Sequence, residues 1–359
     1  LGNIEIVKAL VECNANIHTH PHNDYSPLIQ SIFHRHDDIT IWLLENGVDP
    51  NHSQRRIEEY NEDLPDTFNA FDIVCNNRIW SLIEYFHNAD AKISNLMAIE
   101  DAEGLLVEAC GRGMIWLAEM LVSHGIDPDD YPEDQPTPLI IAAQNGQLDV
   151  VQWLLQQNID INYRHESLDA WGDWIWGGTA LTAALENEHL EIAMELLNHG
   201  ATPNESGIVG ASDEQRYFGF SDVEIHPIFL CIAKKWNILL SKMLSVYNGR
   251  TYGMTKDDIY YSPISIAIKA NNFDAVLMLI GLGHDVNEEV DGWTVVDVLA
   301  YESKRDFLPV LLDNGLSVIR KNLHTGEYVF TTLLEYFPEH REKIMSRLVE
   351  ELDARFAEE

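Results

Sequence analysis

The sequence predicts an all-α solenoid of stacked helix-turn-helix units, and three regularities carry this prediction. A large apolar residue, which we call the anchor, recurs at intervals of 32 to 47 residues along the chain. Fifteen residues after each anchor lies a second large apolar residue. The anchors are Leu28, Phe71, Leu106, Leu139, Leu181, Ile228, Ile264, Val296 and Leu333. A register kept over nine segments indicates repeats that bury their apolar residues against their neighbours.

The third regularity lies four residues after the second apolar position. Seven of the eight residues there are Gly, Asn or Asp, which tolerate the positive φ of a helix end, and Tyr247 is the exception. The eight residues are Gly47, Asp90, Gly125, Asn158, Gly200, Tyr247, Gly283 and Gly315. Each repeat should therefore end its second helix at this point, with Asn158 predicted to adopt a left-handed conformation.

The stretch 134–162 shows one repeat most clearly. Pro138 must lie in a turn or in the first turn of a helix, because proline lacks a backbone donor. Leu139, Ala142 and Ala143 follow at helical spacing, and Asn145-Gly146 then breaks this short helix. A second helix carries an apolar stripe of Leu148, Val151, Leu154 and Leu155. The unit is thus a small-residue inner helix followed by a leucine-rich outer helix.

Thr137-Pro138-Leu139 and Ala142 resemble the Thr-Pro-Leu-His-x-Ala signature of ankyrin repeats, with Ile140 in place of the usual His. The resemblance covers essentially the whole chain, although several repeats are degenerate. It implies an ankyrin-repeat solenoid whose inter-repeat loops form hairpin fingers along one edge. It also implies a protein that binds other proteins through these fingers and the adjoining inner-helix face.

We expect a single array over residues 1–359. A partial repeat occupies 1–16, where an outer helix has no preceding inner helix, so the chain reads as a fragment. Eight repeats begin near residues 24, 67, 102, 134, 177, 224, 259 and 291. A capping repeat covers 330–356, with Ile344, Leu348 and Leu352 on one face of its last helix and charges on the other.

The chain is strongly acidic, since 23 Lys and Arg stand against 59 Asp and Glu, a net charge of −36. This charge argues against nucleic acid or an anionic membrane as a partner, because both require basic patches. No apolar run approaches the length of a membrane-spanning helix. We expect a partner protein with a basic surface, while the plain alternative is that the charge only keeps the protein in solution.

Much of the acidity falls in the inter-repeat loops, which should stack into one acidic ridge. The loop acids are Glu58, Glu59, Glu62, Asp63, Asp127, Asp129, Asp130, Glu133, Asp134, Asp169, Asp173, Asp213, Glu214, Glu288, Glu289 and Asp291. Of these, Asp129 and Asp130 are candidate partner-binding residues, together with Tyr60 and Tyr131 from the same kind of loop.

Two insertions supply the remaining candidate partner-binding residues. Trp171, Trp174 and Trp176 lie within six residues, and tryptophan is enriched at binding hot spots. Tyr217, Phe218 and Phe220 lie in the second insertion. For both insertions the alternative stays open that the aromatic side chains fold back over the repeats as a satellite core.

Catalysis, metal binding and cofactor binding find little support. The sequence has no glycine-rich phosphate loop, no His-Glu-x-x-His and no Gly-x-Ser-x-Gly. His18, His20, His22, His34 and His36 cluster in a loop and at a helix end, where solvated or capping histidines are the plainer interpretation. The cysteines are separated along the array, which favours buried free thiols in a reducing compartment.

We therefore predict a cytoplasmic, non-catalytic protein-interaction module without metal or cofactor, in the producing cell or in a host cell if it is translocated. One alternative is the targeting array of a larger enzyme or host-directed effector, and another is an acidic inhibitor or immunity protein. The resemblance also implies that Asn162 and Asn287 match a motif for asparaginyl hydroxylation, although hairpin geometry explains both residues. The sequence leaves the oligomeric state open.

Overall fold

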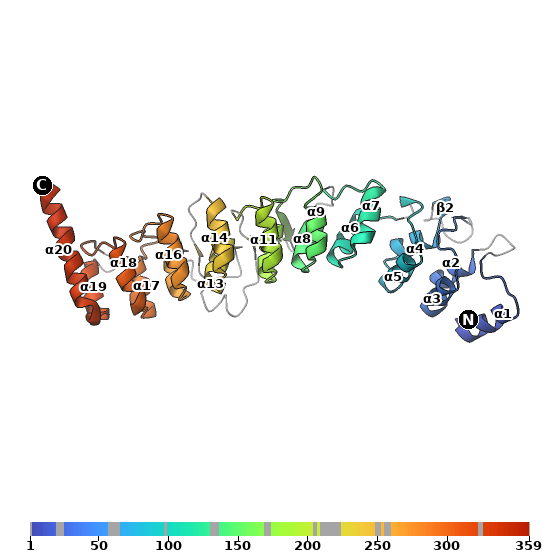
Figure 1. Cartoon of the computed structure of the whole chain (residues 1–359), viewed down its shortest axis with the longest axis horizontal. Coiled ribbons are helices and arrows are strands. Elements are labelled where there is room, and N and C mark those ends of the chain that lie inside the picture. Colours follow the sequence, from blue (N-terminus) through green and yellow to red (C-terminus); the bar gives the residue numbers. More distant parts are fainter. Residues whose placement is uncertain are drawn as a thin grey trace. The chain divides into compact units, whose positions relative to one another are not determined.

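The computed structural model describes residues 2–18, 25–56, 65–96, 99–129, 136–168, 174–203, 207–208, 224–247, 253–254, 260–321 and 326–358. Over these residues short helices follow one another in pairs, with short strands in some of the loops (Figure 1). The predicted all-α fold of helix-turn-helix repeats is confirmed. No described helix is both long enough and apolar enough to cross a membrane.

Contacts between Cα atoms divide the chain into two compact units, 1–141 with 156–159 and 142–155 with 160–359, which we call unit 1 and unit 2. The single array therefore stays a prediction. Unit 1 contains α1 (Ile4–Glu12), α2 (Pro27–Phe33), α3 (Asp37–Glu45), α4 (Ala70–Asn76), α5 (Trp80–Asn88), α6 (Ala102–Gly111) and α7 (Ile115–Ser123).

Helix α8 (Pro138–Gln144) begins in unit 1 and ends in unit 2. Unit 2 continues with α9 (Leu148–Leu154), α10 (Ala180–Glu186), α11 (Leu190–Asn198), α13 (Pro227–Lys234), α14 (Asn237–Val246), α15 (Pro263–Lys269), α16 (Phe273–Gly281), α17 (Val295–Glu302), η2 (Arg305–Phe307), α18 (Leu308–Asp313), α19 (Val329–Tyr336), η3 (Pro338–His340) and α20 (Arg341–Glu358).

Side-chain caps explain where the inner helices begin. Ser262 accepts a hydrogen bond from the N–H of Ser265, and Pro263 occupies the first turn of α15, where its missing donor costs nothing. The side chains of Thr294 and Asp297 satisfy each other's backbone N–H at the start of α17. The Ser/Thr-Pro part of the repeat signature is thus a helix start signal.

The outer helices mostly end as predicted, at residues with positive φ. These residues are Gly47, Asp90, Gly125, Gly200, Gly283 and Gly315. Tyr247 adopts an extended conformation with φ of −90°. The prediction for Asn158 is wrong: the cap of α9 is Leu155 in a right-handed conformation, and Asn158 is not among the described residues with positive φ.

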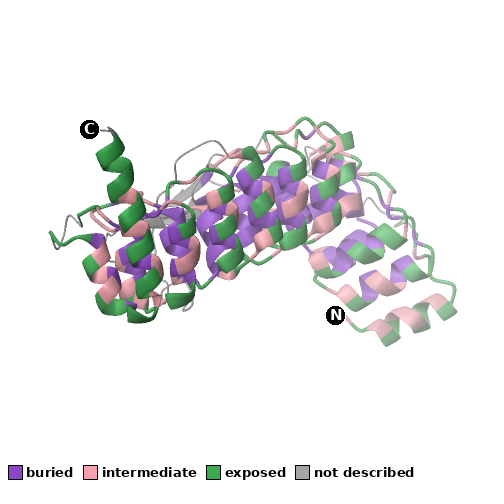
Figure 2. Cartoon of the chain, turned by 60° about the vertical axis from the view of Figure 1, so that its left-hand side comes forward, coloured by how far each residue is buried: buried purple, intermediate pink, exposed green. Residues whose placement is uncertain are grey.

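The core lies where the repeat register places it. All nine anchors are at most 3% exposed, and eight of the nine residues fifteen positions later are also buried, with Leu348 partly exposed. Figure 2 shows that the buried residues gather where neighbouring helices face one another. Cys75, Cys110 and Cys231 are buried free thiols, and burial raises the pKa of Cys110 to about 12, so its thiol stays protonated.

Short strands form the bases of the fingers. In unit 1, β1 (Gln54–Arg55) pairs with β2 (Thr67–Phe68), and in unit 2, β7 (Gly253–Met254) pairs with β8 (Tyr260–Tyr261). The two inserted fingers share one antiparallel sheet in the order β3 (His165–Leu168), β4 (Trp174–Gly178), β5 (Gly207–Ile208) and β6 (Glu224–Ile225). Successive fingers are therefore joined by backbone pairing.

An asparagine that recurs 23 residues after the anchor joins neighbouring repeats by one donated and one accepted hydrogen bond, and we call this pair of bonds the asparagine bracket. The Nδ2 atom of Asn287 donates to the carbonyl of Gly315 at 2.9 Å, and its Oδ1 atom accepts from the N–H of Ser317 at 2.7 Å. The same bracket joins Asn51 to Asp90 and Lys92, and Asn162 to Gly200 and Thr202. Asn162 and Asn287 thus have a structural role between repeats, while their hydroxylation stays a prediction.

Candidate partner-binding surface

Aromatic residues recur three positions before the anchor, where the chain passes from a finger into an inner helix. They are Tyr25, Phe68, Tyr261, Trp293 and Phe330. Residues from successive repeats meet there: the ring centroids of Tyr25 and Phe68 lie 5.8 Å apart, and those of Tyr261 and Trp293 lie 5.6 Å apart. The spacing suits tilted aromatic packing between repeats.

In unit 1 this aromatic row belongs to the core. Tyr25 and Phe68 are both buried, and Phe33 packs on Tyr25 with its ring edge at a centroid distance of 5.3 Å. Phe68 is completely inaccessible and ends strand β2 just before α4. The rings of Tyr25 and Phe68 hold two repeats together and offer a partner little surface, while Phe33, five residues after its anchor as Tyr301 is in unit 2, is half-buried.

In unit 2 the corresponding row reaches the surface. Tyr261 is nearly buried and Trp293 is half-buried, but Tyr301 at the end of α17 is 79% exposed. The rings of Trp293 and Tyr301 meet edge to face, with centroids 6.5 Å apart at 89°. Lys269 places its ammonium group 5.2 Å from the Tyr261 ring centroid. Two aromatic rings and a cation thus stand next to solvent.

The next repeat extends this surface. Tyr328 is 44% exposed and stacks on the half-buried Phe330 at a centroid distance of 5.7 Å. Lys321 lies 5.0 Å from the Tyr328 ring centroid, and Lys321 and Tyr328 also pair through their backbones. Helices α17 and α19 are in contact, so the repeats are neighbours. We call Tyr261, Trp293, Tyr301, Tyr328 and Phe330 the aromatic face.

Acidic residues border the aromatic face at its finger. Val290 and Trp293 pair across a tight turn whose tip is the exposed Asp291, with φ of 53°. Glu289 points away from solvent and pairs with Arg320 at 3.0 Å, its side chain only 10% exposed. Of these two loop acids, Asp291 is therefore the exposed one, while Glu289 is paired with Arg320.

The predicted candidate residues fall mostly outside the described part of the chain. Those outside it are Tyr60, Tyr131, Asp130, Trp171, Tyr217, Phe218 and Phe220, with the loop acids Glu58, Glu59, Glu62, Asp63, Glu133, Asp134, Asp169, Asp173, Asp213 and Glu214. Asp129 is exposed and donates its backbone N–H to the Asp127 carboxylate at 3.0 Å. Asp127 thus forms a turn, which is a structural role for an acid of the predicted ridge.

The backbone of the tryptophan insertion is described in part. Trp174 pairs with Leu168 and Trp176 pairs with Ser167, so the register skips Ile175 and β4 bulges between the two tryptophans. The insertion is therefore a hairpin finger. Whether its tryptophans bind a partner or pack on the repeats stays an open prediction.

The described residues contain no group of three or more His, Cys, Asp or Glu side chains placed to hold a metal ion. His34 and His36 stack on each other with ring centroids 6.0 Å apart, which gives them an aromatic contact. The aromatic face was not predicted from the sequence, because the predicted aromatic candidates lie in the inter-repeat loops and the two insertions. Its signal was the aromatic residue three positions before the anchor in adjacent repeats.

Models of protein families agree with this description of the repeats. A family model of three ankyrin repeats matches residues 71–165, and a single-repeat model matches residues 176–208. The ankyrin repeat domain of human ASB11 is similar in structure, with a TM-score of 0.44 and 18% identity, over 67% of this chain and 96% of that one.

Among curated proteins, the chain is 26% identical over 156 residues to an ankyrin repeat and KH domain-containing protein of Caenorhabditis briggsae, covering 43% of this chain and 6% of that protein. It is 35% identical over 88 residues to alpha-latrocrustotoxin-Lt1a of Latrodectus tredecimguttatus, covering 24% of this chain and again 6% of the relative. A fowlpox virus ankyrin repeat protein is 27% identical over 184 residues, half of this chain and 48% of that protein. The repeat geometry and both family models agree that the chain contains ankyrin repeats, at residues 71–165 and 176–208.

Proposed function

We propose that the chain binds another protein through the aromatic face and the adjoining fingers, without catalysing a reaction. Ankyrin repeats are protein-interaction modules, so the class of function follows from the family. The observation that supports this particular surface is the exposure of Tyr301, which meets the half-buried Trp293, and of Tyr328 in the next repeat. Tyrosine and tryptophan bury a large area at low entropic cost and are enriched at binding hot spots.

The partner that we propose has a basic surface. The net charge of −36 creates a long-range attraction for cations, which accelerates the encounter with a basic protein. Asp291 lies at the turn next to Trp293, so some of this charge adjoins the aromatic face. Lys269 and Lys321 lie on aromatic rings of the face itself, so the face carries both acidic and basic groups.

A capture experiment tests the proposal. The wild-type chain and the Tyr301→Ala/Tyr328→Ala variant are immobilised, incubated with lysate of the source cells, and the bound proteins are quantified by mass spectrometry. We expect at least one basic protein to be enriched by the wild type and lost from the variant.

The matched control is Ile238→Ala/Leu277→Ala, which removes two exposed apolar side chains from the outer helices α14 and α16. This control should retain the partner. Equal recovery by all three proteins would show that the aromatic face does not bind it, and circular dichroism should show that all three are folded.

The lengths of the relatives favour a second candidate function. The chain matches only 6% of each of the first two curated relatives, so its repeats resemble a small part of much longer proteins. This supports the alternative of a targeting array within a larger enzyme or host-directed effector, acting in the cytoplasm of the producing cell or of a host. The full gene sequence tests it, since a catalytic domain upstream of Leu1 is the expected result and its absence would refute it.

The acidic inhibitor or immunity protein remains a special case of the main proposal. It requires the same basic partner, with the partner's activity blocked in the complex. An association rate that falls steeply between low and high salt would support it, because exposed charges are screened over about 8 Å at physiological ionic strength. A rate independent of salt would contradict any function based on the charge.

A further inference from the structure

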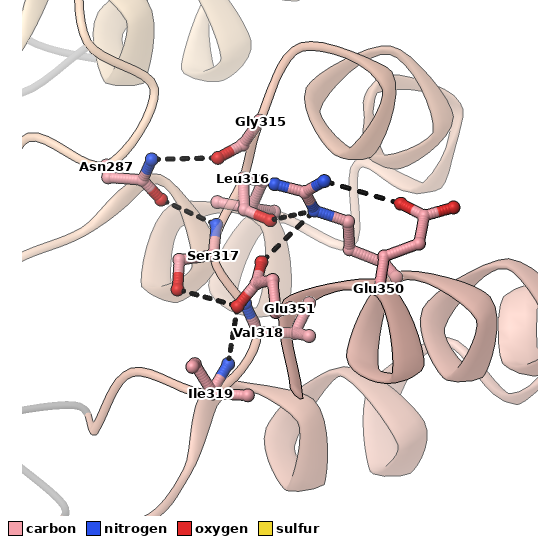
Figure 3. Close-up of polar contacts among 9 residues, drawn as sticks. Asn287, Gly315, Leu316, Ser317, Val318, Ile319, Glu350 and Glu351 are labelled. Atoms are coloured by element: carbon pink, nitrogen blue, oxygen red, sulfur yellow. Dashed lines mark hydrogen bonds and ion pairs between the residues drawn. The ribbon is translucent and has the colours of Figure 1, made fainter. Parts of the chain in front are cut away.

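The last helix, α20, is fixed in its rotation by polar contacts on one side (Figure 3). The Glu351 carboxylate accepts hydrogen bonds from the Ser317 hydroxyl at 3.0 Å and from the N–H of Val318 at 3.1 Å, and it pairs with Arg347 at 3.1 Å. About two turns before Glu351, Lys343 pairs with Asp313 of α18 at 2.7 Å. Because these groups hold one side of α20 to the preceding repeat, the helix cannot rotate to bury its opposite side.

The opposite side is apolar. Met345, Val349, Leu352 and Phe356 are 38%, 53%, 38% and 73% exposed, and their spacing of four, three and four residues places all four on one stripe of the helix. We call these residues the seam. The seam corrects the sequence-based expectation of a charged outer face on α20, since only Ile344 of the three residues expected to be covered is buried.

The repeat register identifies what this side of an outer helix normally does. Twelve residues after each of the first eight anchors the side chain is completely buried, and after the ninth it is the exposed Met345. The eight buried residues are Thr40, Ile83, Ala118, Val151, Ala193, Leu240, Val276 and Leu308. The seam therefore begins at a position that is completely buried in each of the eight earlier repeats and exposed in the last one.

Helix α20 is not shaped to be followed by another ordinary repeat. Six of the earlier outer helices are followed by a residue with positive φ nineteen positions after the anchor, where the chain turns into the next finger. At that position α20 has Leu352, and the helix continues to Glu358. The continuation carries the seam onward through Phe356, so an ordinary finger cannot begin at that point.

We propose that the seam pairs with the α20 helix of a second copy of this chain, in antiparallel orientation. The four-three-four spacing is the same in both directions, so an antiparallel copy places Met345 opposite Phe356 and Val349 opposite Leu352. A two-fold symmetric interface requires this self-complementarity. Because Met345 and Phe356 are 11 positions apart, the seam spans only about 16 Å of helix. The interface is therefore small, and the dimer is expected to be weak.

The charges of α20 fit this occupant. In a chain of net charge −36, residues 341–358 contain 4 basic and 5 acidic residues, a net charge of 4 − 5 = −1, so two acidic chains meet here with little repulsion. Lys343, Arg347 and Glu351 are paired on the side that faces the preceding repeat, so their charges do not border the seam. The antiparallel orientation sets the dipoles of the two helices head to tail, whereas a parallel pair would set like ends together.

Sedimentation velocity over a concentration series tests the proposal on the full chain. The wild type should shift from monomer to dimer as its concentration rises to about 0.3 mM, because a small interface gives a weak dimer. Val349→Asp and Leu352→Asp should each raise the dimer dissociation constant by about tenfold or more. The matched control Ile238→Asp adds the same charge at an exposed apolar residue of α14 and should leave the dimer unchanged.

The orientation is tested by disulfide cross-linking in a Cys13→Ser background, which removes the exposed native thiol. Met345→Cys protein mixed with Phe356→Cys protein should form a mixed disulfide, while neither protein alone should cross-link with itself. A wild type that stays monomeric, a dimer that survives Val349→Asp and Leu352→Asp with their helicity intact, or self-linking of the Met345→Cys protein would each overturn the proposal. The seam and the aromatic face have no residue in common, so the two proposals fail separately.

Discussion

The position three residues before the anchor holds aromatic rings in both units, but the rings have different roles. In unit 1, Tyr25 and Phe68 are buried between repeats and serve as core. In unit 2, Tyr261 and Trp293 make the equivalent contact, but Tyr301 continues the row into solvent. The position three residues before the anchor thus holds aromatic side chains that join repeats, and the row continues to the half-buried Phe33 in unit 1 and to the exposed Tyr301 in unit 2.

The comparison predicts its largest effect at Phe68. Because this ring is completely buried, Phe68→Ala should lower the free energy of unfolding by about 3–5 kcal/mol through lost burial and the cavity left behind. Chemical denaturation monitored by circular dichroism measures it. Tyr301→Ala serves as the comparison and should change stability by less than about 0.5 kcal/mol, as expected for a surface position. Equal losses would mean that the two rows play the same role.

The asparagine brackets should matter equally in both units, because the brackets, unlike the aromatic rows, have the same geometry throughout. Asn51→Ala in unit 1 and Asn287→Ala in unit 2 each remove one donated and one accepted hydrogen bond between repeats. We expect each to cost about 1–2 kcal/mol. The corresponding Asn→Asp variants set a carboxylate oxygen against the carbonyl that accepted from the amide, so they should cost at least as much as alanine. A loss in one unit alone would contradict a common framework.

A smaller, pH-dependent effect is expected at His226, which contacts the rings of Phe229 and Tyr247 and caps α13 through Nδ1. Burial lowers the pKa of His226 to about 4 in the folded chain, against an ordinary value of 6.5. The unfolded chain therefore takes up the proton first, so stability is lost as the pH falls from about 6.5 to about 4 and changes no further below that.

Melting curves at about pH 7 and about pH 4.5 measure this effect, with His226→Gln as the comparison. The variant should lose less stability on acidification, because it has no imidazole to protonate. Both proteins share every other titrating group, including the buried Asp72, so their difference reports on His226 alone. The side chain is only partly buried by area, which limits the size of the effect. Equal losses would show that His226 does not contribute.

Much of the fold was predictable because the repeat is local. The anchors, the second apolar positions and six of the helix-ending residues follow from spacings within one repeat, and the structure confirms them. The prediction of a left-handed Asn158 was wrong because asparagine permits positive φ without requiring it, and α9 ends earlier at Leu155. The prediction of a charged outer face on α20 was wrong for a different reason: an apolar stripe indicates a face that packs, but not whether a partner helix is present.

The candidate surface was harder to predict because exposure depends on neighbouring repeats. Tyr25 and Tyr261 occupy the same position of the repeat, so this position alone does not predict how exposed the next ring in the row is. Tyr301 was not recognised because it lies inside a helix that otherwise reads as core. Glu351 contacts residues more than 30 positions away, and no local pattern announces such a contact.

The most direct test of the central claim is the affinity of the captured partner for three proteins: the wild type, Tyr301→Ala and Leu277→Ala. Both substitutions remove an exposed side chain from unit 2, one from the aromatic face and one from the outer helix α16. Isothermal titration calorimetry should show about a tenfold or larger loss of affinity for Tyr301→Ala and no loss for Leu277→Ala. Unchanged affinity for Tyr301→Ala, with both variants as stable as the wild type, would contradict the assignment of the aromatic face as the binding surface.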